Sequence, residues 1–591
     1  MKRVSIQILC ALLLIPSAHG TTRTCADLSQ AELNDAINGI TSSGHTTWNT
    51  PLVDGDTVIL PSGDVTWTVP VQFTQGINIE GQTVVNNDGT LADNTIIRNN
   101  VGTSQNAAIF LPDFNNPTEP LRLTGVTFRG GTIRNTSSGA TVYMVGVFNP
   151  DPTTTPGGIR IDHCHFDSLK PASDVDAPGW IYGVIDHCVF DETEPGKDSV
   201  STRPAGWGGG ESGWESWAEG PDFGTYKFLF IENCFFINHT TAMNTGTLDS
   251  QRGGRWVGRY NVFINCNEFY HGSDSGAGRL NYRGTRAVEL YNNTFLTNIQ
   301  ISGGYTRGGS LLWYNNAYYY NCYPPGFVYP GPTPVPGPNG GTNGGMSLKL
   351  YRMSQGTNVP SPGQWTVANG QSAWDKNVTE SDGVTHIDGH PPYLFLTGTA
   401  AGDITIAGET VTFAVATANP PLPLTVNAWS GYSVTNTQRG TYKGRASYII
   451  SNTRNTITCV LGAVHNTALR FAVNDSFSIY KVLNVLDSPG MGKDGTPLTG
   501  SPPIAVPPAP LNQAVEGCFA WGNTQVIGTG SPIVTCPGSP TSIGWQHTDT
   551  NDPLRLGVNF FNRQPQPGDL IYDSYGAYTP YQYPHPLVSR L

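Results

Sequence analysis

One short phrase recurs through the first half of the chain and restricts its fold more than any other feature of the sequence. It is Ile-Asp-His-Cys-His-Phe at 161–166, Ile-Asp-His-Cys-Val-Phe at 185–190 and Ile-Glu-Asn-Cys-Phe-Phe at 231–236, with looser copies at 259–263, 290–295 and 313–318. Aligned on the closing aromatic residue, successive copies lie 24, 46, 27, 32 and 23 residues apart. A recurring period of roughly 20–50 residues is typical of proteins built from stacked structural repeats.

Each copy is short and alternates apolar with polar residues, so the repeated unit is a strand followed by a turn rather than a helix. A bare period of 23 or 24 residues fits a chain in which each coil stacks on its neighbour and buries a shared core. We therefore predict an all-β solenoid whose longer periods carry loop insertions. The gap of 46 residues is either one coil with a large insertion or two coils.

The fourth position of the phrase carries a small set of residue types. It is occupied by Cys164, Cys188, Cys234, Asn261, Asn293 and Asn316. Asparagine at a fixed turn position can hydrogen-bond to the asparagine one coil away, and we expect such a ladder here. Cysteine at the same position is either a small buried substitute or a residue that oxidises with its neighbour. Elsewhere, we predict a disulfide between Cys518 and Cys536, which flank a short Gly/Pro/Thr segment.

Composition excludes several classes of protein. Charged residues make up 13% of the 591 residues, against a usual share of roughly 25%. Coiled coils and charged disordered tails need far more Glu, Lys and Arg. The formal net charge of −12 also opposes general nucleic-acid binding, which needs a basic surface to neutralise phosphates.

The N-terminus has the pattern of an export signal. Lys2 and Arg3 precede an apolar run over 4–15, and a small-residue cleavage site ends at Gly20. This pattern predicts a signal peptide over 1–20 and a secreted, extracellular or periplasmic protein. The run is too short for a membrane span of about 20 residues, and no later stretch qualifies. Ser29 and Glu32 then have capping-box spacing, which predicts a short N-terminal helix that caps the solenoid.

The rest of the chain divides by composition. Residues 21–345 hold the cap and the main coils and end in a Pro/Gly-rich loop, and 346–395 form a connecting segment. Strand-like stretches over 396–485 indicate a small inserted β module. We expect 486–591 to contain returning coils and a C-terminal wrap rich in Tyr and Pro.

The chain resembles the pectate lyase superfamily of right-handed parallel β-helix proteins over roughly residues 50–322. The opening coils, the Ile-Asp-His-Cys phrases and the Asn-Asn-Thr-Phe coils carry this resemblance. It looks closest to uncharacterised secreted β-helix repeat proteins, which share segments like 283–295 and 578–587. The resemblance implies the fold; the function must come from the site, since β-helices host many activities. The sequence lacks the Arg-x-Pro-x-x-Arg element expected of pectate lyases. It also lacks the motifs expected of polygalacturonases, which are Asn-Thr-Asp, Asp-Asp and Gly-His-Gly.

A cluster of arginines in an acidic chain is the strongest sign of a site. Seven arginines and no lysine lie between 252 and 307, with three acidic residues, a balance of +4. Stacked coils would bring them onto one face, where guanidinium groups suit the carboxylates of an acidic polysaccharide. The alternative is that they pair with nearby carboxylates. The substrate-binding candidates are Arg252, Arg255, Arg259 and Arg279.

These residues suggest a β-elimination. That reaction must neutralise a uronate carboxylate, remove the C5 proton and protonate the leaving oxygen. The resemblance to pectate lyases assigns Arg283 or Arg286 as clamp or base, and His271 is the candidate for proton transfer. The alternative for His271 is a turn histidine bonded to the backbone.

Three further groups are candidate site residues. Asp249 and Asp274 are candidate Ca²⁺ ligands, although calcium needs six to eight oxygens. Trp207, Trp214 and Trp217 either stack on sugars as a cleft wall or pack on the solenoid. Asp162, Asp186 and Glu232 share one repeat position that Arg259 takes in the next copy, which predicts an acidic ladder neutralised by Arg259 or else a metal or acid–base site.

We therefore expect a polysaccharide lyase that acts on an acidic, uronate-containing polymer. The alternative is a non-enzymatic glycan-binding adhesin or a self-associating structural fibre, which the low charge and the missing catalytic motifs also suit. No cofactor other than Ca²⁺ is expected. The expected partner is a polysaccharide, with no nucleic acid and no membrane span, and self-association is an open alternative.

Overall fold

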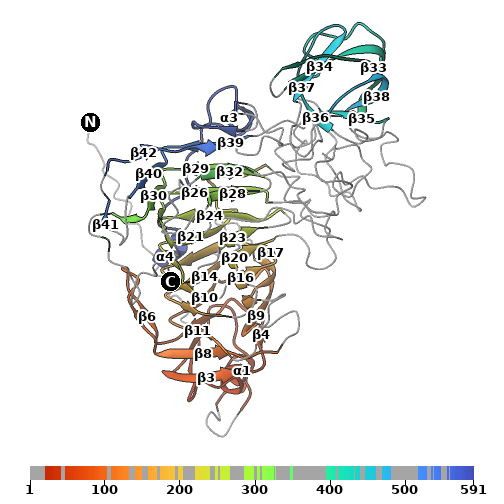
Figure 1. Cartoon of the computed structure of the whole chain (residues 1–591). Helices are drawn as coiled ribbons and strands as arrows, with labels where there is room; N and C mark the ends of the chain where they lie inside the picture. Colours follow the sequence, from red (N-terminus) through yellow and green to blue (C-terminus); the bar gives the residue numbers. More distant parts are fainter. Residues whose placement is uncertain are drawn as a thin grey trace, which may run out of the picture.

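The computed structural model describes residues 20–41, 47–102, 108–131, 140–148, 158–169, 173–193, 198–203, 220–239, 246–250, 253–266, 285–297, 302–306, 309–324, 327, 347–350, 394–407, 410–430, 433–438, 446–460, 469–480, 517–528, 534–536, 538–546, 556–557 and 560–590. Strands dominate these residues, and most of them belong to long parallel sheets (Figure 1). The prediction of an all-β chain is confirmed. Of the predicted signal peptide over 1–20, only Gly20 lies within the described residues.

Three sheets carry most of the strands, which are named below in their spatial order within each sheet. Sheet A has twelve strands: β1 (Thr22–Thr24), β2 (Thr57–Ile59), β5 (Asn78–Glu80), β10 (Leu121–Thr124), β14 (Ile159–Asp162), β18 (Gly183–Asp186), β21 (Leu229–Glu232), β24 (Arg255–Arg259), β26 (Ala287–Tyr291), β29 (Ser310–Tyr314), β39 (Cys518–Trp521) and β44 (Phe560–Phe561). Sheet B has eleven: β3 (Gly63–Trp67), β8 (Thr95–Asn99), β11 (Thr127–Gly130), β15 (His165–Asp167), β19 (Val189–Glu192), β22 (Phe235–Asn238), β25 (Val262–Ile264), β27 (Thr294–Thr297), β30 (Ala317–Tyr320), β40 (Thr524–Ile527) and β42 (Thr541–Ser542). Sheet C has eight: β17 (Gly179–Ile181), β13 (Val145–Phe148), β9 (Phe110–Asn115), β12 (Ala140–Tyr143), β16 (Ser173–Ala177), β20 (Asp198–Thr202), β23 (Gly246–Ser250) and β4 (Val71–Phe73), which pairs with β9.

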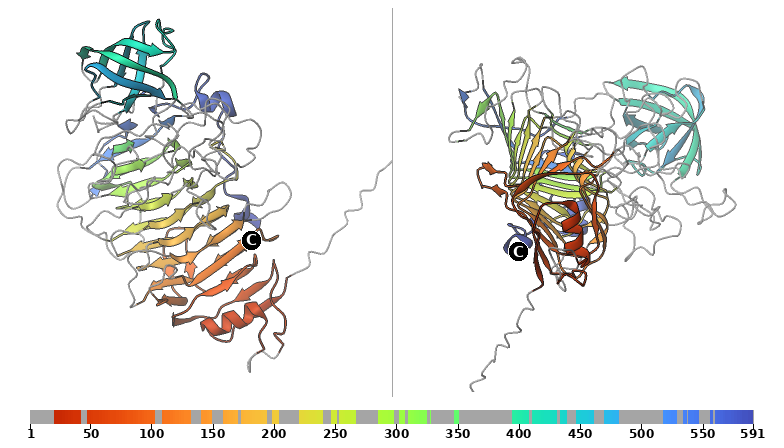
Figure 2. Two further views of the ribbon diagram at one scale, coloured as in Figure 1. Left: turned by 90° about the vertical axis from the view of Figure 1, so that its right-hand side faces the viewer. Right: turned by 90° about the horizontal axis from the view of Figure 1, so that it is seen from below.

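The chain visits these sheets in turn. Strands β18, β19 and β20 lie in sheets A, B and C, and β21, β22 and β23 repeat that order one position further along each sheet. The pairing is parallel and in register, as between β18 and β21 and between β19 and β22. The strands of each sheet therefore lie one above another in Figure 1 and in the left view of Figure 2.

Three small sheets accompany the long ones. They are β28 (Ser302–Thr306) with β32 (Ser347–Leu350) and β43 (Trp545–Gln546), β31 (Cys322–Tyr323) with β41 (Val534–Thr535), and β6 (Val84–Val85) with β7 (Leu91–Ala92). Helix α3 (Leu570–Tyr575) and helix α4 (Pro586–Arg590) belong to the C-terminal segment. No helix among the described residues is both long and apolar enough to cross a membrane.

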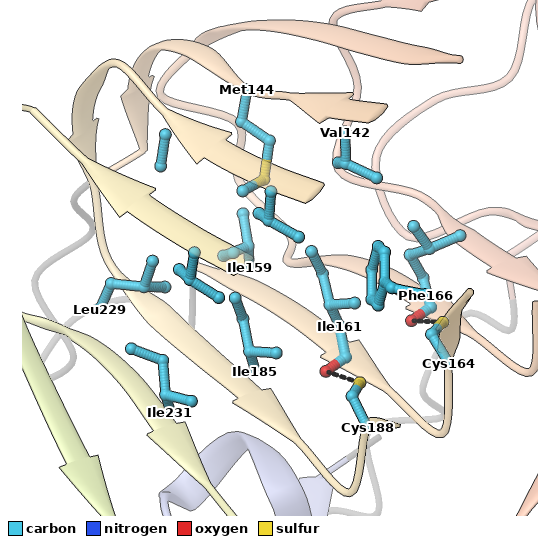
Figure 3. Close-up of a cluster of buried hydrophobic side chains, with 14 of the residues drawn as sticks. Val142, Met144, Ile159, Ile161, Cys164, Phe166, Ile185, Cys188, Leu229 and Ile231 are labelled. Atoms are coloured by element: carbon cyan, nitrogen blue, oxygen red, sulfur yellow. Dashed lines mark hydrogen bonds between the residues drawn. The ribbon is translucent and has the colours of Figure 1, made fainter. Parts of the chain in front are cut away.

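The inward side chains of the long sheets form one main core, part of which Figure 3 shows. The closing aromatics of the repeated phrase stack through it. Phe166, Phe190 and Phe236 follow one another with ring centroids 4.6 and 4.8 Å apart, and the stack continues through Phe263 and Phe295 to Tyr318. Because Phe190 pairs directly with Phe236, the gap of 46 residues is one turn of the chain with an insertion.

The predicted asparagine ladder is present at the turn between sheets A and B. The side-chain amide of Asn261 donates to Oδ1 of Asn293 at 3.0 Å, and Asn293 donates to Asn316 at 2.9 Å. Asn523, on the returning strand pair β39–β40, extends the ladder from Asn316 at 3.0 Å. In the earlier copies, Cys164, Cys188 and Cys234 are buried free thiols, so the alternative of oxidised ladder cysteines is not what the structure shows.

The predicted disulfide is wrong. Cys536 is bonded to Cys322, 214 residues away in sequence, and Cys518 keeps a reduced, buried thiol that donates to the carbonyl oxygen of Gly309 at 3.3 Å. Cys518 opens β39 and occupies the core, whereas Cys322 opens β31 and Cys536 directly follows β41, the strand paired with β31. Strand pairing between distant coils, rather than a short loop, brings the two bonded cysteines together.

The predicted N-terminal helix is α1 (Gln30–Asn38). The Ser29 hydroxyl accepts a hydrogen bond from the backbone N–H of Glu32 at 3.1 Å, as a capping box requires. Leu33, Ala36 and Ile37 pack into the main core, and α1 lies at the end of the stack beside β2 and β4 (Figures 1 and 2).

Residues 394–480 contain an antiparallel sheet with its own core. Its strands are β33 (Leu394–Ala407), β34 (Thr410–Asn419), β37 (Thr456–Val460), β36 (Ala446–Asn452), β35 (Ser433–Asn436) and β38 (Val473–Tyr480) in pairing order. β38 pairs with both β35 and β33, so each of the six strands has two neighbours. These strands occupy the region that the sequence assigns to an inserted module.

Candidate functional site

The outer face of sheet C, which points away from the main core, is the candidate site. Val175, Val200 and Leu248 lie in the main core, so strand alternation turns the residues on either side of them outward. Seven outward side chains on the neighbouring strands β12, β16, β20 and β23 carry oxygen: Tyr143, Asp174, Asp176, Ser199, Ser201, Thr247 and Asp249. We call these seven residues the sheet C site.

The sheet C site is buried and acidic. Its seven side chains are at most 6% exposed. Arg203, directly after β20, pairs with the carboxylate of Asp176. Asp176 raises the pKa of the Arg203 guanidinium well above its ordinary value, and Tyr143 and Asp249 add to that effect. Buried charges interact strongly because little water screens them.

One register row sets two carboxylates a fixed distance apart. Asp176 pairs with Ser201, and Ser201 pairs with Asp249. Neighbouring strands lie about 4.8 Å apart, so the backbones of the two aspartates are separated by about 9.6 Å with a serine between them. This arrangement is available to acid–base chemistry or to an ion held between the carboxylates.

The donor set of the sheet C site fits a hard cation. All its polar atoms are oxygens, the ligands that Ca²⁺ takes. The Oγ1 atom of Thr247 is buried and has no hydrogen-bond partner within the described part of the chain. Asp249, one of the two predicted Ca²⁺ ligands, belongs to this set, while the other, Asp274, lies outside the described residues.

Another acidic cluster is already neutralised. Asp93, which lies between β7 and β8, is close to His165 and Asp167 on β15 of sheet B. Arg129 pairs with both aspartates, at 2.6 Å from Asp93, and thereby occupies the place of a cation. We therefore assign this cluster no metal.

Most of the sequence-predicted site residues lie outside the described residues: Trp207, Trp214, Trp217, Arg252, His271, Asp274, Arg279 and Arg283. In chain order, the tryptophans come between β20 of sheet C and β21 of sheet A, and Arg252 comes between β23 and β24. Residues 271–283 come between β25 and β26. In sequence, therefore, the tryptophans and Arg252 follow strands of sheet C.

Three predicted arginines are described, and they are not on sheet C. Arg255 and Arg259 lie on β24 of sheet A, and Arg286 directly precedes β26. Arg255 pairs with Asp222 at 3.0 Å. Arg259 pairs with Glu232 at 2.7 Å and donates to the carbonyl oxygens of the C-terminal segment at 581 and 582. Arg286 is fully buried and approaches Ser310 at 3.4 Å. Arg255 and Arg259 are therefore engaged by carboxylates, as the alternative for this cluster expects.

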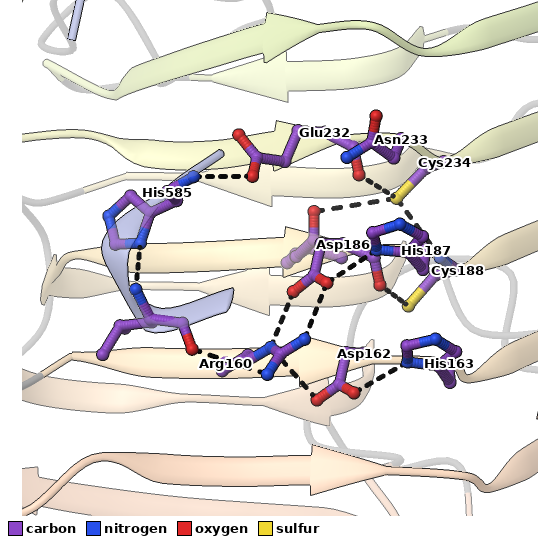
Figure 4. Close-up of polar contacts among 12 residues, drawn as sticks. Arg160, Asp162, His163, Asp186, His187, Cys188, Glu232, Asn233, Cys234 and His585 are labelled. Atoms are coloured by element: carbon purple, nitrogen blue, oxygen red, sulfur yellow. Dashed lines mark hydrogen bonds and ion pairs between the residues drawn. The ribbon is translucent and has the colours of Figure 1, made fainter. Parts of the chain in front are cut away.

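The predicted acidic ladder lies on the outer face of sheet A (Figure 4). Asp162 accepts two hydrogen bonds from Arg122, at 2.8 and 2.9 Å. Asp186 accepts two from Arg160, at 2.9 and 3.0 Å. Arg259 pairs with Glu232 alone in this ladder, whereas Arg160 also lies 3.4 Å from Asp162 and so bridges two of the carboxylates.

Arg122 helps to hold Asp162 in its charged form. Burial alone would raise the pKa of Asp162, but hydrogen bonds from Arg122 and from the adjacent histidine hold it well below its usual range. The pKa of Glu232 is raised because burial outweighs the charge of Arg259. The ladder is a neutralised structural network beneath the C-terminal segment.

Sequence reasoning missed Glu289. Its side chain is 1% exposed on β26 and accepts hydrogen bonds from the Tyr578 hydroxyl at 2.5 Å and from the Gly224 N–H at 2.7 Å. Burial raises its pKa to about 7. Tyr578 also lines a cavity of about 150 Å³ with Phe223, Leu312 and Tyr575. The sequence signal that could have found Glu289 is a single acidic residue within the apolar strand Ala-Val-Glu-Leu-Tyr.

No protein-family model, no curated protein and no solved structure matches this chain. The resemblance to the pectate lyase superfamily thus stays an expectation from the sequence.

Proposed function

We propose that the chain winds as a right-handed parallel β-helix, is secreted, and cleaves an acidic polysaccharide at the outer face of sheet C. The cyclic visits to sheets A, B and C support the winding, and crossovers between parallel strands are right-handed in nearly all proteins. The observation that carries the function is the sheet C site itself, where seven oxygen-bearing side chains share one face.

The proposed reaction is a β-elimination on a uronate. A Ca²⁺ ion bound among these oxygens would neutralise the carboxylate of the substrate and make its C5 proton more acidic. Arg203 lies beside the carboxylates and can bind a second anionic group of the polymer. Of the sequence candidates, Arg283 would be the base, because Arg286 is fully buried next to β26 of sheet A, and His271 would be the acid. The C5–H and C4–O bonds break, a C4–C5 double bond forms, and the leaving oxygen takes a proton.

Hydrolysis is a second candidate because of the row that joins Asp176 and Asp249. Their backbone separation of about 9.6 Å is close to the roughly 6.5–9.5 Å between the carboxyl groups of inverting glycosidases, which admits a water molecule. One aspartate would then protonate the leaving oxygen while the other activates water.

The burial of the sheet C site is the observation that favours the non-enzymatic alternative, a glycan-binding or self-associating protein. Polar side chains that are fully buried can simply stabilise the stack of strands. Such a protein would retain polysaccharide without shortening it.

The test is to incubate the purified protein with pectate, alginate and glycosaminoglycans, with and without Ca²⁺. The lyase proposal predicts ultraviolet absorbance from an unsaturated product that appears with new reducing ends. New reducing ends without that absorbance would support the hydrolase. Retention of polymer on immobilised protein without cleavage would overturn both enzymatic proposals.

A further inference from the structure

Two stacked histidines mark the turn between sheets A and B. His163 and His187 follow the ladder residues Asp162 and Asp186 in successive turns of the chain. Their rings are almost parallel, with an interplanar angle of 2° and centroids 5.2 Å apart. Figure 4 shows the two rings one above the other beside their aspartates.

Each ring is held in one orientation by its neighbour. The Nδ1 atom of His163 lies 2.8 Å from Asp162, and Nδ1 of His187 lies 2.8 Å from Asp186. The carboxylates cannot swing away, because Arg122 and Arg160 bind them on the other side. A proton on Nδ1 then leaves the lone pair of Nε2 available.

Both Nε2 atoms are available to a ligand. Among the residues that the structure describes, neither has a hydrogen-bond partner. The side chains of His163 and His187 are 36% and 21% exposed. A carboxylate that orients an imidazole whose other nitrogen is free is the usual second shell of a metal-bound histidine.

The backbone does not require histidine here. Both residues have a left-handed φ of 51°, which asparagine and glycine adopt most readily. Asparagine or glycine occupies the equivalent turn position in five other copies: Gly125, Asn233, Asn292, Asn315 and Gly522. The two histidines thus adopt a conformation that other residues adopt more easily.

We propose that His163 and His187 bind one divalent transition-metal ion of the Zn²⁺, Cu²⁺ or Ni²⁺ class through their Nε2 atoms. Imidazole nitrogen is a preferred ligand of these ions. With metal–nitrogen bonds of about 2.0–2.1 Å, the two nitrogens that share one ion lie at most about 4.2 Å apart. The nearly parallel rings must therefore turn their Nε2 atoms toward each other, about their hydrogen bonds to the aspartates, when the ion binds. The remaining positions are open to water. The site cross-links successive turns of the chain and is independent of the proposed activity on polysaccharide.

The test measures Zn²⁺ binding to the full chain by titration calorimetry and locates the ion by anomalous diffraction from Zn²⁺-soaked crystals. We expect one ion per chain at this place, with an anomalous peak between the two Nε2 atoms. His163→Asn and His187→Asn should each weaken binding at least about tenfold. Asparagine suits the left-handed turn, so both variants should fold.

His239→Asn is the matched control, because that ring faces Asp191 on sheet B at 2.7 Å and should not affect Zn²⁺ binding. Zn²⁺ should also raise the thermal unfolding temperature of the wild type and leave that of the double variant unchanged, because a ligand stabilises only the state that binds it. Unchanged Zn²⁺ affinity in the double variant, or no anomalous peak at this pair, would overturn the proposal.

Discussion

At the scale of single residues, Glu289 makes the sharpest prediction. Its pKa of about 7 in the fold lies above the ordinary value near 4.3, so the folded state binds more protons than the unfolded state between these values. Stability should therefore fall as the pH rises from about 5 to 8. The loss should be on the order of 3 kcal/mol. Glu289→Gln should largely remove it.

Denaturant unfolding of both proteins at pH 5 and pH 8 measures this effect. Asp64→Asn is the control, since this carboxylate forms an exposed pair with Arg98 and should leave the pH dependence intact. Equal pH dependence in wild type and Glu289→Gln would contradict the assignment. Alternation within residues 287–291 predicts that Glu289 points outward. Its hydrogen-bond partner Tyr578 is 289 residues away, and no sequence pattern predicts that contact.

At the scale of elements, the asparagine ladder should respond to a single deletion. The amide of Asn293 donates to Gly258, Tyr291 and Asn316, and its oxygen accepts from Asn261. Asn293→Ala leaves buried groups unpaired and should lower the free energy of unfolding by roughly 3 kcal/mol. Asn293→Cys should cost less, because cysteine fills this position in three other copies and its thiol approaches a carbonyl oxygen. Urea unfolding measures the free energy of unfolding of both variants. An equal loss of stability in Asn293→Ala and Asn293→Cys would show that Asn293 does not stabilise the fold through the ladder hydrogen bonds.

The ladder and the aromatic stack were predictable because the same residue types return at the same place in each coil. The strands of sheet C were not, since Ser-Asp-Val-Asp-Ala, Asp-Ser-Val-Ser-Thr and Gly-Thr-Leu-Asp-Ser share only an apolar centre. The acidic character of the sheet C site therefore emerges only when the register aligns them. For the same reason the partner of Cys536 could not be found from sequence spacing.

At the scale of the whole molecule, the C-terminal segment covers the charged face of sheet A. The backbone N–H of His585 donates to Glu232, and Arg259 donates to carbonyl oxygens at 581 and 582. Deletion of 578–591 exposes this network and should destabilise the fold by several kcal/mol, as the loss of partners from buried ion pairs does. Thermal unfolding should shift down clearly, while Tyr583→Phe, which removes one exposed hydrogen bond to Asn233, should hardly change it. An unchanged unfolding temperature after deletion would show that the segment is dispensable.

The central claim is that polysaccharide is cleaved at the outer face of sheet C. The most direct test measures the activity of Asp176→Asn and Asp249→Asn on the polyuronate that the wild type degrades best. Asp64→Asn is the control. These substitutions keep the side-chain volume while removing one charge. We predict that each sheet C variant loses at least about a hundredfold in rate, because it removes a Ca²⁺ ligand of the proposed lyase or, in the hydrolase, an acid–base group of the kind that contributes about 10²–10⁴-fold, and that Asp64→Asn keeps full activity. Full activity in both sheet C variants would contradict the account.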